Sequence, residues 1–91
     1  MSNGSVIIDS HDLRDFASEL SRYNQDLNAL TSRFNANFRR LGDTWRDPAY
    51  GRFGQEFEQM LANIRRFQKV SEDVIPKLRA KADRVDQVHH S

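Results

Sequence analysis

A seven-residue apolar repeat is the feature that most restricts how this chain can fold. Its main series recurs every seven residues, and a second series follows three residues after the first three members. The two series are Leu13, Leu20, Leu27, Phe34 and Leu41, and Phe16, Tyr23 and Leu30. Such spacing places apolar side chains on one face of an α-helix, as in a coiled coil. No Pro or Gly interrupts the repeat, which predicts one long helix over about residues 10–41.

A turn over residues 42–47 separates this helix from a second one. Gly42 is expected to end the first helix in a left-handed conformation at the C′ position. Asp47 and Pro48 mark the next start, because an N-cap aspartate accepts from free backbone N–H groups and proline fits the first helical position. Asp9, or the serine after it, is the expected cap of the first helix. So short a turn makes the two helices antiparallel neighbours.

A second apolar pattern predicts a helix over about residues 48–87. Its members alternate by three and four, with only Ser71 and Lys81 polar. The apolar members are Tyr50, Phe53, Phe57, Met60, Ile64, Phe67, Val74, Leu78, Val85 and Val88. Pro76 lies inside the pattern, where proline removes a backbone hydrogen bond and clashes with the preceding turn. We therefore expect a kink or break near Pro76.

Two helices touching along one line would leave a continuous apolar stripe in water, more than monomers usually expose. A second hairpin covers such a stripe. The sequence thus predicts an all-α, single-domain antiparallel helical hairpin, residues 1–91, that assembles as a dimeric four-helix bundle. The partner is the chain itself, as a homodimer, or a related helical hairpin. The expected dimer seam is Leu13, Phe16, Leu20, Leu27, Leu30, Phe34, Phe53, Phe57, Ile64, Phe67, Val74 and Leu78.

Composition excludes several kinds of chemistry. The chain has no cysteine, so a structural disulfide, a thiolate metal site and a cysteine nucleophile are excluded. A formal net charge of +1 gives no overall attraction to nucleic acid or anionic membrane. No apolar run approaches the roughly 18 residues of a membrane span. The N-terminus lacks the basic and apolar regions of a signal peptide, so we expect a cytoplasmic protein or one secreted without a cleaved signal peptide.

The carboxylates do not form an acid/base pair. Asp47 already has a structural role as the N-cap before Pro48. Glu56 and Glu58 are two residues apart and point to different faces of their helix. We therefore predict no catalytic residue, no cofactor and no enzymatic activity.

The histidines and the basic residues of the second helix have plain structural interpretations. His89 and His90 cannot both face one metal ion along a helix, even with Asp86 one turn back, so no metal site is predicted. Four basic residues lie on outer positions interleaved with acids, which is typical of a solvated helix face rather than a nucleic-acid surface. These are Arg65, Arg66, Lys69 and Arg79.

The stretch Leu41-Gly42-Asp43-Thr44-Trp45, in a hairpin of just under 100 residues, resembles the turn of the WXG family. These are small helical-hairpin proteins of type VII secretion systems. The resemblance implies antiparallel four-helix bundles as homo- or heterodimers, with Trp45 packed near the end of the partner chain. The third motif position here is Asp47 instead of Gly, and no tyrosine follows Tyr50 to supply the C-terminal export signal of secreted members.

The predicted function is a protein-binding module that dimerises through its apolar seams. The two helices of the module are joined by a turn motif, which consists of Gly42, Trp45, Asp47 and Pro48. By resemblance the protein is secreted by, or serves as a partner in, a type VII-like secretion system, and it contacts a secretion-system or cargo protein. The alternative is an intracellular coiled-coil adaptor or an antitoxin-like binder.

Overall fold

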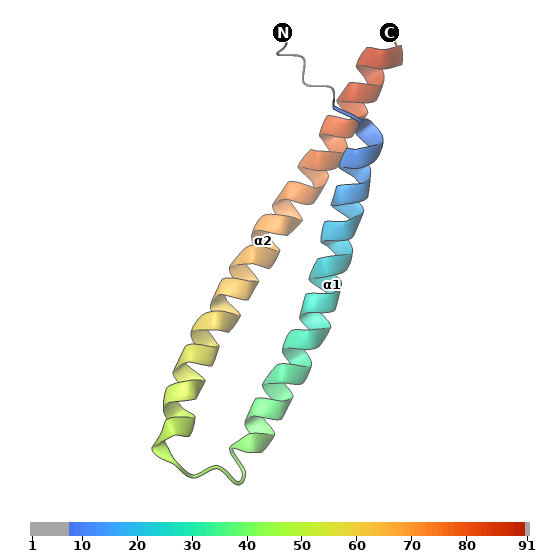
Figure 1. Cartoon of the computed structure of the whole chain (residues 1–91). Coiled ribbons are helices and arrows are strands. Elements are labelled where there is room, and N and C mark those ends of the chain that lie inside the picture. Colours follow the sequence, from blue (N-terminus) through green and yellow to red (C-terminus); the bar gives the residue numbers. More distant parts are fainter. Residues whose placement is uncertain (1–7, 91) are drawn as a thin grey trace.

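The computed structural model describes residues 8–90, which form two long antiparallel helices. Helix α1 spans Ser10–Leu41 and helix α2 spans Pro48–His90, and no strand is present in this part of the chain. The hairpin is elongated, with extents of 67 × 26 × 16 Å. Figure 1 shows the start of α1 beside the end of α2, which we call the terminal end, with the turn end opposite. The predicted all-α hairpin is therefore confirmed.

Helix α1 begins where the sequence predicts. Asp9 is its N-cap in an extended conformation, and its Oδ1 accepts from the backbone N–H of His11 at 2.8 Å. The first turn contains the acidic Asp12, and the last turn contains Arg39 and Arg40. Each of these charges is opposite in sign to the partial charge of the helix end where it lies, which stabilises the helix.

The prediction of a left-handed Gly42 is wrong. Its φ and ψ are −64° and −18°, which is right-handed helical backbone that any residue adopts. The glycine is explained by close packing instead, because a Cβ built there would lie 2.5 Å from Oη of Tyr50. That hydroxyl donates to the carbonyl of Phe38 at 2.9 Å. Gly42 thus lets the Tyr50 side chain cross the end of α1.

The turn satisfies the backbone groups at both helix ends. The carbonyl of Leu41 accepts from the N–H groups of Thr44 and Trp45, at 3.2 and 2.9 Å. Asp47 Oδ1 accepts from the N–H of Ala49 at 2.9 Å, just before α2 begins at Pro48. The predicted N-cap and the predicted proline at the first helical position are both present.

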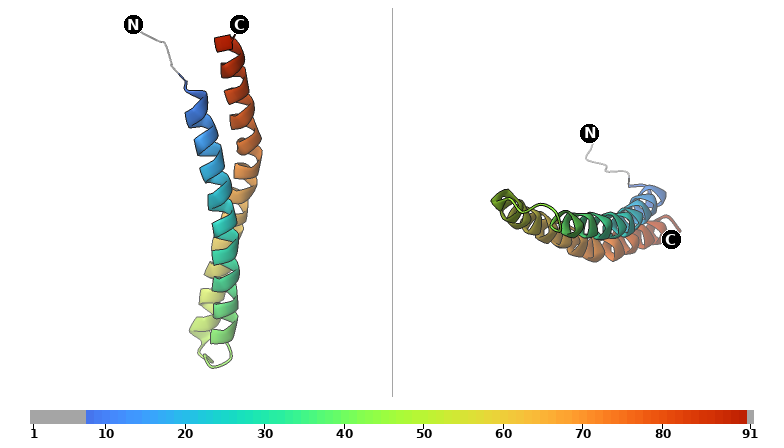
Figure 2. Two further views of the ribbon diagram at one scale, coloured as in Figure 1. Left: turned by 90° about the vertical axis from the view of Figure 1, so that its right-hand side faces the viewer. Right: turned by 90° about the horizontal axis from the view of Figure 1, so that it is seen from below.

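Helix α2 is not broken at Pro76, where the sequence predicts a kink or a break, so the predicted break is wrong. The helix runs continuously from Pro48 to His90 with Pro76 inside it, and its ribbon bows gradually along its length (Figure 2). Pro76 and Glu72 are both exposed, so water can hydrate the carbonyl that loses its helical donor. On the other face, the half-buried Val74 and Leu78 keep packing against α1 on either side of the proline.

Small side chains line the contact between the helices toward the terminal end and in the middle of α2. Ala17 of α1 and Ala82 of α2 are both 0% exposed there, and Ser71 is 3% exposed. Toward the turn the space between the helices is filled by stacked aromatic rings of Phe38 and Tyr50, 4.6 Å apart.

An ion pair joins the helices at the terminal end. Arg14 contacts Asp83 at 2.8 Å and Asp86 at 2.7 Å. Hydrogen bonds to Asp86 and then to Asp83 raise the pKa of the Arg14 guanidinium above its usual value. All three side chains stay at least 39% exposed, so the contact orients the helix ends more than it stabilises them.

Candidate protein-binding face

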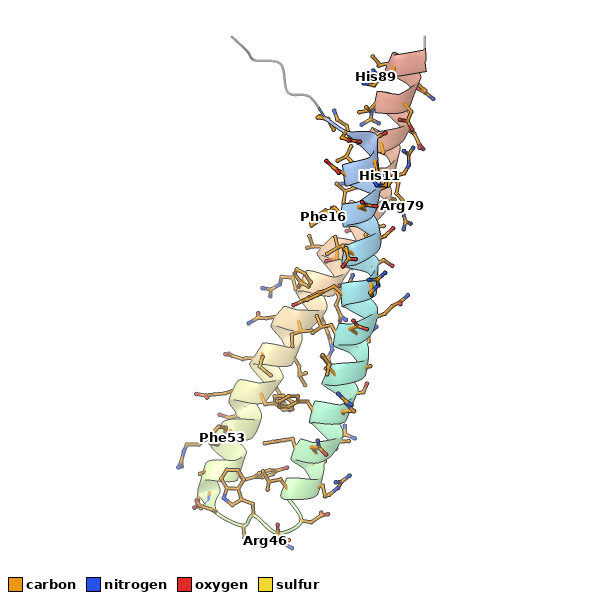
Figure 3. The ribbon with its side chains drawn as sticks, turned by 45° about the vertical axis from the view of Figure 1, so that its right-hand side comes forward. His11, Phe16, Arg46, Phe53, Arg79 and His89 are labelled. Carbon is orange, nitrogen blue, oxygen red and sulfur yellow. The ribbon has the colours of Figure 1, made fainter. Side chains whose placement is uncertain are left out.

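One long face of the hairpin exposes large apolar side chains from both helices. Each is between 45% and 65% exposed, far more than a hydrophobic core residue. We call this surface the open face; its members are Phe16, Tyr23, Leu30, Phe34 and Leu41 of α1, and Phe53, Met60, Phe67 and Val70 of α2. Figure 3 shows Phe16 toward the terminal end and Phe53 near the turn, so the face runs nearly the whole length of the molecule.

The predicted dimer seam divides into two separate surfaces. Some of its residues pack between α1 and α2 and are half-buried: Leu13, Leu20, Leu27, Phe57, Ile64, Val74 and Leu78. The others belong to the open face: Phe16, Leu30, Phe34, Phe53 and Phe67. The exposure of an apolar stripe by a single hairpin is therefore confirmed, whereas its coverage by a second hairpin stays a prediction.

Small and polar residues complete the contact between the helices, and the repeat did not reveal them. Gln68 Nε2 donates to Asn28 Oδ1 at 2.7 Å and to the backbone carbonyl of Asn24 at 3.3 Å. The side-chain Nδ2 and Oδ1 atoms of Asn24 are buried with no hydrogen-bond partner. Ala17 is 0% exposed on the inner side of α1, where a larger residue would push the helices apart. A search for large apolar residues passes over all four.

Trp45 lies at the turn end of the open face. Its ring packs edge-on against Tyr50, at 5.5 Å between centroids, and lies tilted against Phe53 at 5.8 Å. Phe38 stacks on the other side of the group and contacts Phe57 at 5.1 Å. The tryptophan is half-buried within its own chain, so one side of the indole remains available to a partner. Asp47, in contrast, caps the start of α2, and Pro48 is the first residue of that helix.

A groove of about 590 Å³ opens on this face near the turn. Both helices line it, mostly with aromatic and aliphatic side chains, and the one carboxylate in the lining is that of Glu56. The lining residues are Phe34, Asn37, Phe38, Leu41, Phe53, Glu56, Phe57 and Met60. An apolar groove of this kind between two helices suits side chains of another helix better than a polar small molecule.

The hairpin therefore combines an apolar face, exposed along both helices, with a tryptophan in the turn. The model of WXG100, proteins of 100 residues with WXG, matches residues 5–88. The chain belongs to this family. Comparison with curated proteins and with solved structures gives no match.

Membership makes this a small helical protein associated with type VII secretion. WXG100 proteins are typically paired helical hairpins in secretion systems, and they are not known as enzymes. In residues 8–90 of this WXG100 protein no helix is long and apolar enough to cross a membrane. Its motif reads Trp45-Arg46-Asp47, and the structure explains the third residue: Asp47 caps α2 through its side chain, which glycine cannot do.

The described residues bring together no set of metal-ligating or catalytic side chains. No group of three or more His, Asp and Glu side chains among them could hold a metal ion. His89 is exposed, and the side chain of His90 lies outside the described part. Asp47 is used as a cap, and Glu56 stands at the rim of the apolar groove. The open face is therefore the strongest candidate for a functional site.

Proposed function

We propose that this WXG100 protein is a non-enzymatic protein-binding module of a type VII-like secretion system, and that it works as a dimer of hairpins. The open face carries this proposal. Half-exposed aromatic and aliphatic residues along both helices are unfavourable in water. Burying them against another apolar surface stabilises the protein. A second hairpin offers a surface of the same length, and four helices together enclose a core.

The dimer forms by packing the open faces of two hairpins. Each buried large apolar side chain contributes roughly 1.5–3 kcal/mol relative to leaving it exposed. Because the face holds nine such side chains, each now about half exposed, its coverage supplies a substantial part of the free energy of folding. The hairpin and its partner then fold and assemble together, as in obligate dimers.

The binding part of the proposal is tested with one charged substitution in the face. Phe67→Glu places a carboxylate in the middle of the open face, where burial against a partner is costly. Ala62→Glu is the matched control, since Ala62 is exposed on the opposite side of α2. We expect Phe67→Glu to halve the solution mass measured by light scattering and Ala62→Glu to leave it unchanged. If the wild-type chain is a dimer, an unchanged mass for both variants would contradict binding through this face.

The secretion part is tested in the native host. Because no tyrosine follows Tyr50 to supply the export signal, we expect the protein to leave the cell with a partner that carries this signal. It should appear in the culture medium of cells with an intact type VII secretion system and be lost from the medium when that system is deleted. The Phe67→Glu variant should be retained in the cells, and Ala62→Glu should be exported. Retention of the wild-type protein in cells with the intact system would favour the alternative, an intracellular adaptor or antitoxin-like binder.

A further inference from the structure

The apolar series on α1 has one polar interruption, and it lies in the groove near the turn. Residues at seven-residue intervals share one side of a helix, and one such series of the open face ends with Asn37. Its earlier members are Phe16, Tyr23 and Leu30. Asn37 lines the groove and is exposed, and within residues 8–90 its side chain makes no hydrogen bond. A surface that only packs against an apolar helix would have an apolar residue here, so the amide indicates a ligand with a polar group.

Two arginines flank this amide on the surface of α1. Arg33 is four residues before Asn37 and Arg40 is three residues after it, which makes both its neighbours one turn away. Both arginines are exposed, and in the described part of the chain neither makes an ion pair. Guanidinium groups and a side-chain amide all donate hydrogen bonds to carboxylates. The α1 side of the groove therefore offers donors for an anionic head group.

The rest of the groove is apolar and large enough for an aliphatic chain. Its volume of about 590 Å³ falls within the roughly 300–1,000 Å³ of ligand pockets. Phe34, Phe53 and Met60 of its lining are 45–65% exposed, and a chain lying on them would remove this apolar surface from water. The one carboxylate in the lining, that of Glu56, is on α2, so it repels an anionic head group toward α1.

We propose that the groove binds the anion of a fatty acid, with the carboxylate at Asn37, Arg33 and Arg40 and the chain along the phenylalanine rings. The proposal does not rest on the proposed function, because a single hairpin contains all of these residues. The two are connected, since the fatty acid occupies part of the open face that a partner hairpin would cover. Bound fatty acid and a partner then compete, and the fatty acid raises the dimer Kd.

Binding is measured on the wild-type chain with dodecanoate, below the concentration at which it forms micelles. Trp45 is the only tryptophan, and its ring lies 5.8 Å from that of Phe53 in the groove lining, so its fluorescence reports on the groove. Isothermal titration calorimetry gives the stoichiometry. We expect one dodecanoate per chain, and roughly tenfold weaker binding of dodecyltrimethylammonium, a cation with the same chain. Equal binding of the two ligands, or none of dodecanoate, would overturn the proposal.

Substitutions at the head-group site test its residues one by one. Arg40→Gln together with Arg33→Gln should raise the dodecanoate Kd roughly tenfold, because two exposed ion pairs are lost. Arg39→Gln is the matched control: Arg39 is exposed in the same last turn of α1 but, one residue away, lies on a different side of the helix. It should leave the Kd unchanged. An equal loss of affinity in Arg39→Gln would mean that only net charge matters and would overturn the site.

Asn37→Leu separates a carboxylate site from a merely apolar one. Leucine makes the groove more apolar and removes a donor, so dodecanoate should bind more weakly while dodecyltrimethylammonium binds at least as well as to the wild type. Stronger binding of both ligands would show that the groove recognises only the aliphatic chain, and the proposal would be wrong.

The other possible occupants of the groove give different results. Sedimentation with phosphatidylglycerol vesicles, in a chain that binds no free dodecanoate, would replace the fatty acid by a membrane surface and overturn the proposal. A dimer that Phe67→Glu dissociates but that binds no dodecanoate would support the proposed function and overturn this site. A hairpin that binds dodecanoate, yet associates neither with itself nor with a related hairpin, would do the reverse.

Discussion

At the scale of single residues, the crossing of Gly42 by Tyr50 makes the end of α1 sensitive to one methyl group. In Gly42→Ala the new Cβ would lie 2.5 Å from Oη and 2.7 Å from Cζ of Tyr50. The ring cannot move freely, because it stacks on Phe38 and donates to its carbonyl. We expect a loss of about 1–3 kcal/mol in the free energy of unfolding, measured by urea denaturation.

Gly51 provides the control for that substitution. It lies within α2, and a Cβ built there meets nothing within 4 Å. Gly51→Ala should therefore raise stability by roughly 0.5–1 kcal/mol, since alanine loses less backbone entropy in a helix. Equal effects of the two substitutions would contradict the role assigned to Tyr50.

Two asparagines one helical turn apart differ in how their side chains are satisfied. Asn24 has both polar side-chain atoms buried without a partner, whereas Asn28 accepts from Gln68 at 2.7 Å. Asn24→Leu should raise the free energy of unfolding by about 1 kcal/mol, because an unsatisfied buried amide is costly. Asn28→Leu should lower it, since Gln68 then loses its side-chain partner. Thermal and urea unfolding of both variants test the opposite signs.

At the scale of helices, the start of α2 depends on the side chain that departs from the family motif. Asp47→Ala removes the acceptor for the Ala49 N–H and should cost about 1 kcal/mol of stability. Asp47→Gly recreates the Trp-x-Gly order, and glycine is a tolerable N-cap, so its cost should be only a few tenths of a kcal/mol. Urea denaturation compares the two variants. A larger loss for glycine than for alanine would show that Asp47 does more than cap the helix.

Pro76 weakens α2 without breaking it. Pro76→Ala restores the N–H that the carbonyl of Glu72 lacks and should raise the free energy of unfolding by up to about 3 kcal/mol. Because Pro76 is exposed and lies outside the open face, the substitution should leave the oligomeric state unchanged. Circular dichroism melts and light scattering measure the two quantities. A change of mass would place Pro76 in the interface.

The helices and their ends were predictable because local chemistry fixes them. The repeat sets the length of α1, and the caps at Asp9 and Asp47 behave as their residue types require. The conformation of Gly42 was not predictable, since it depends on how the Tyr50 side chain packs across the end of α1. The continuity of α2 was not predictable either, since it depends on the exposure of Pro76 and Glu72 in the folded hairpin. The repeat also did not predict which seam residues pack between the helices, because small residues such as Ala17, Ser71 and Ala82 are buried there and do not stand out in a pattern of large apolar side chains.

At the scale of the whole molecule, folding and association should be one reaction. The described residues of a single hairpin fully bury only small side chains, and no large one is less than 2% exposed. A core that exists only in the dimer makes stability depend on protein concentration.

A tenfold increase in concentration should then stabilise the dimer by about 1.4 kcal/mol and raise its melting temperature. Circular dichroism melts across a concentration series measure the shift, with Phe67→Glu as the variant expected to lose it. A melting temperature independent of concentration, in a particle of single-chain mass, would mean that the hairpin is stable with its apolar face in water.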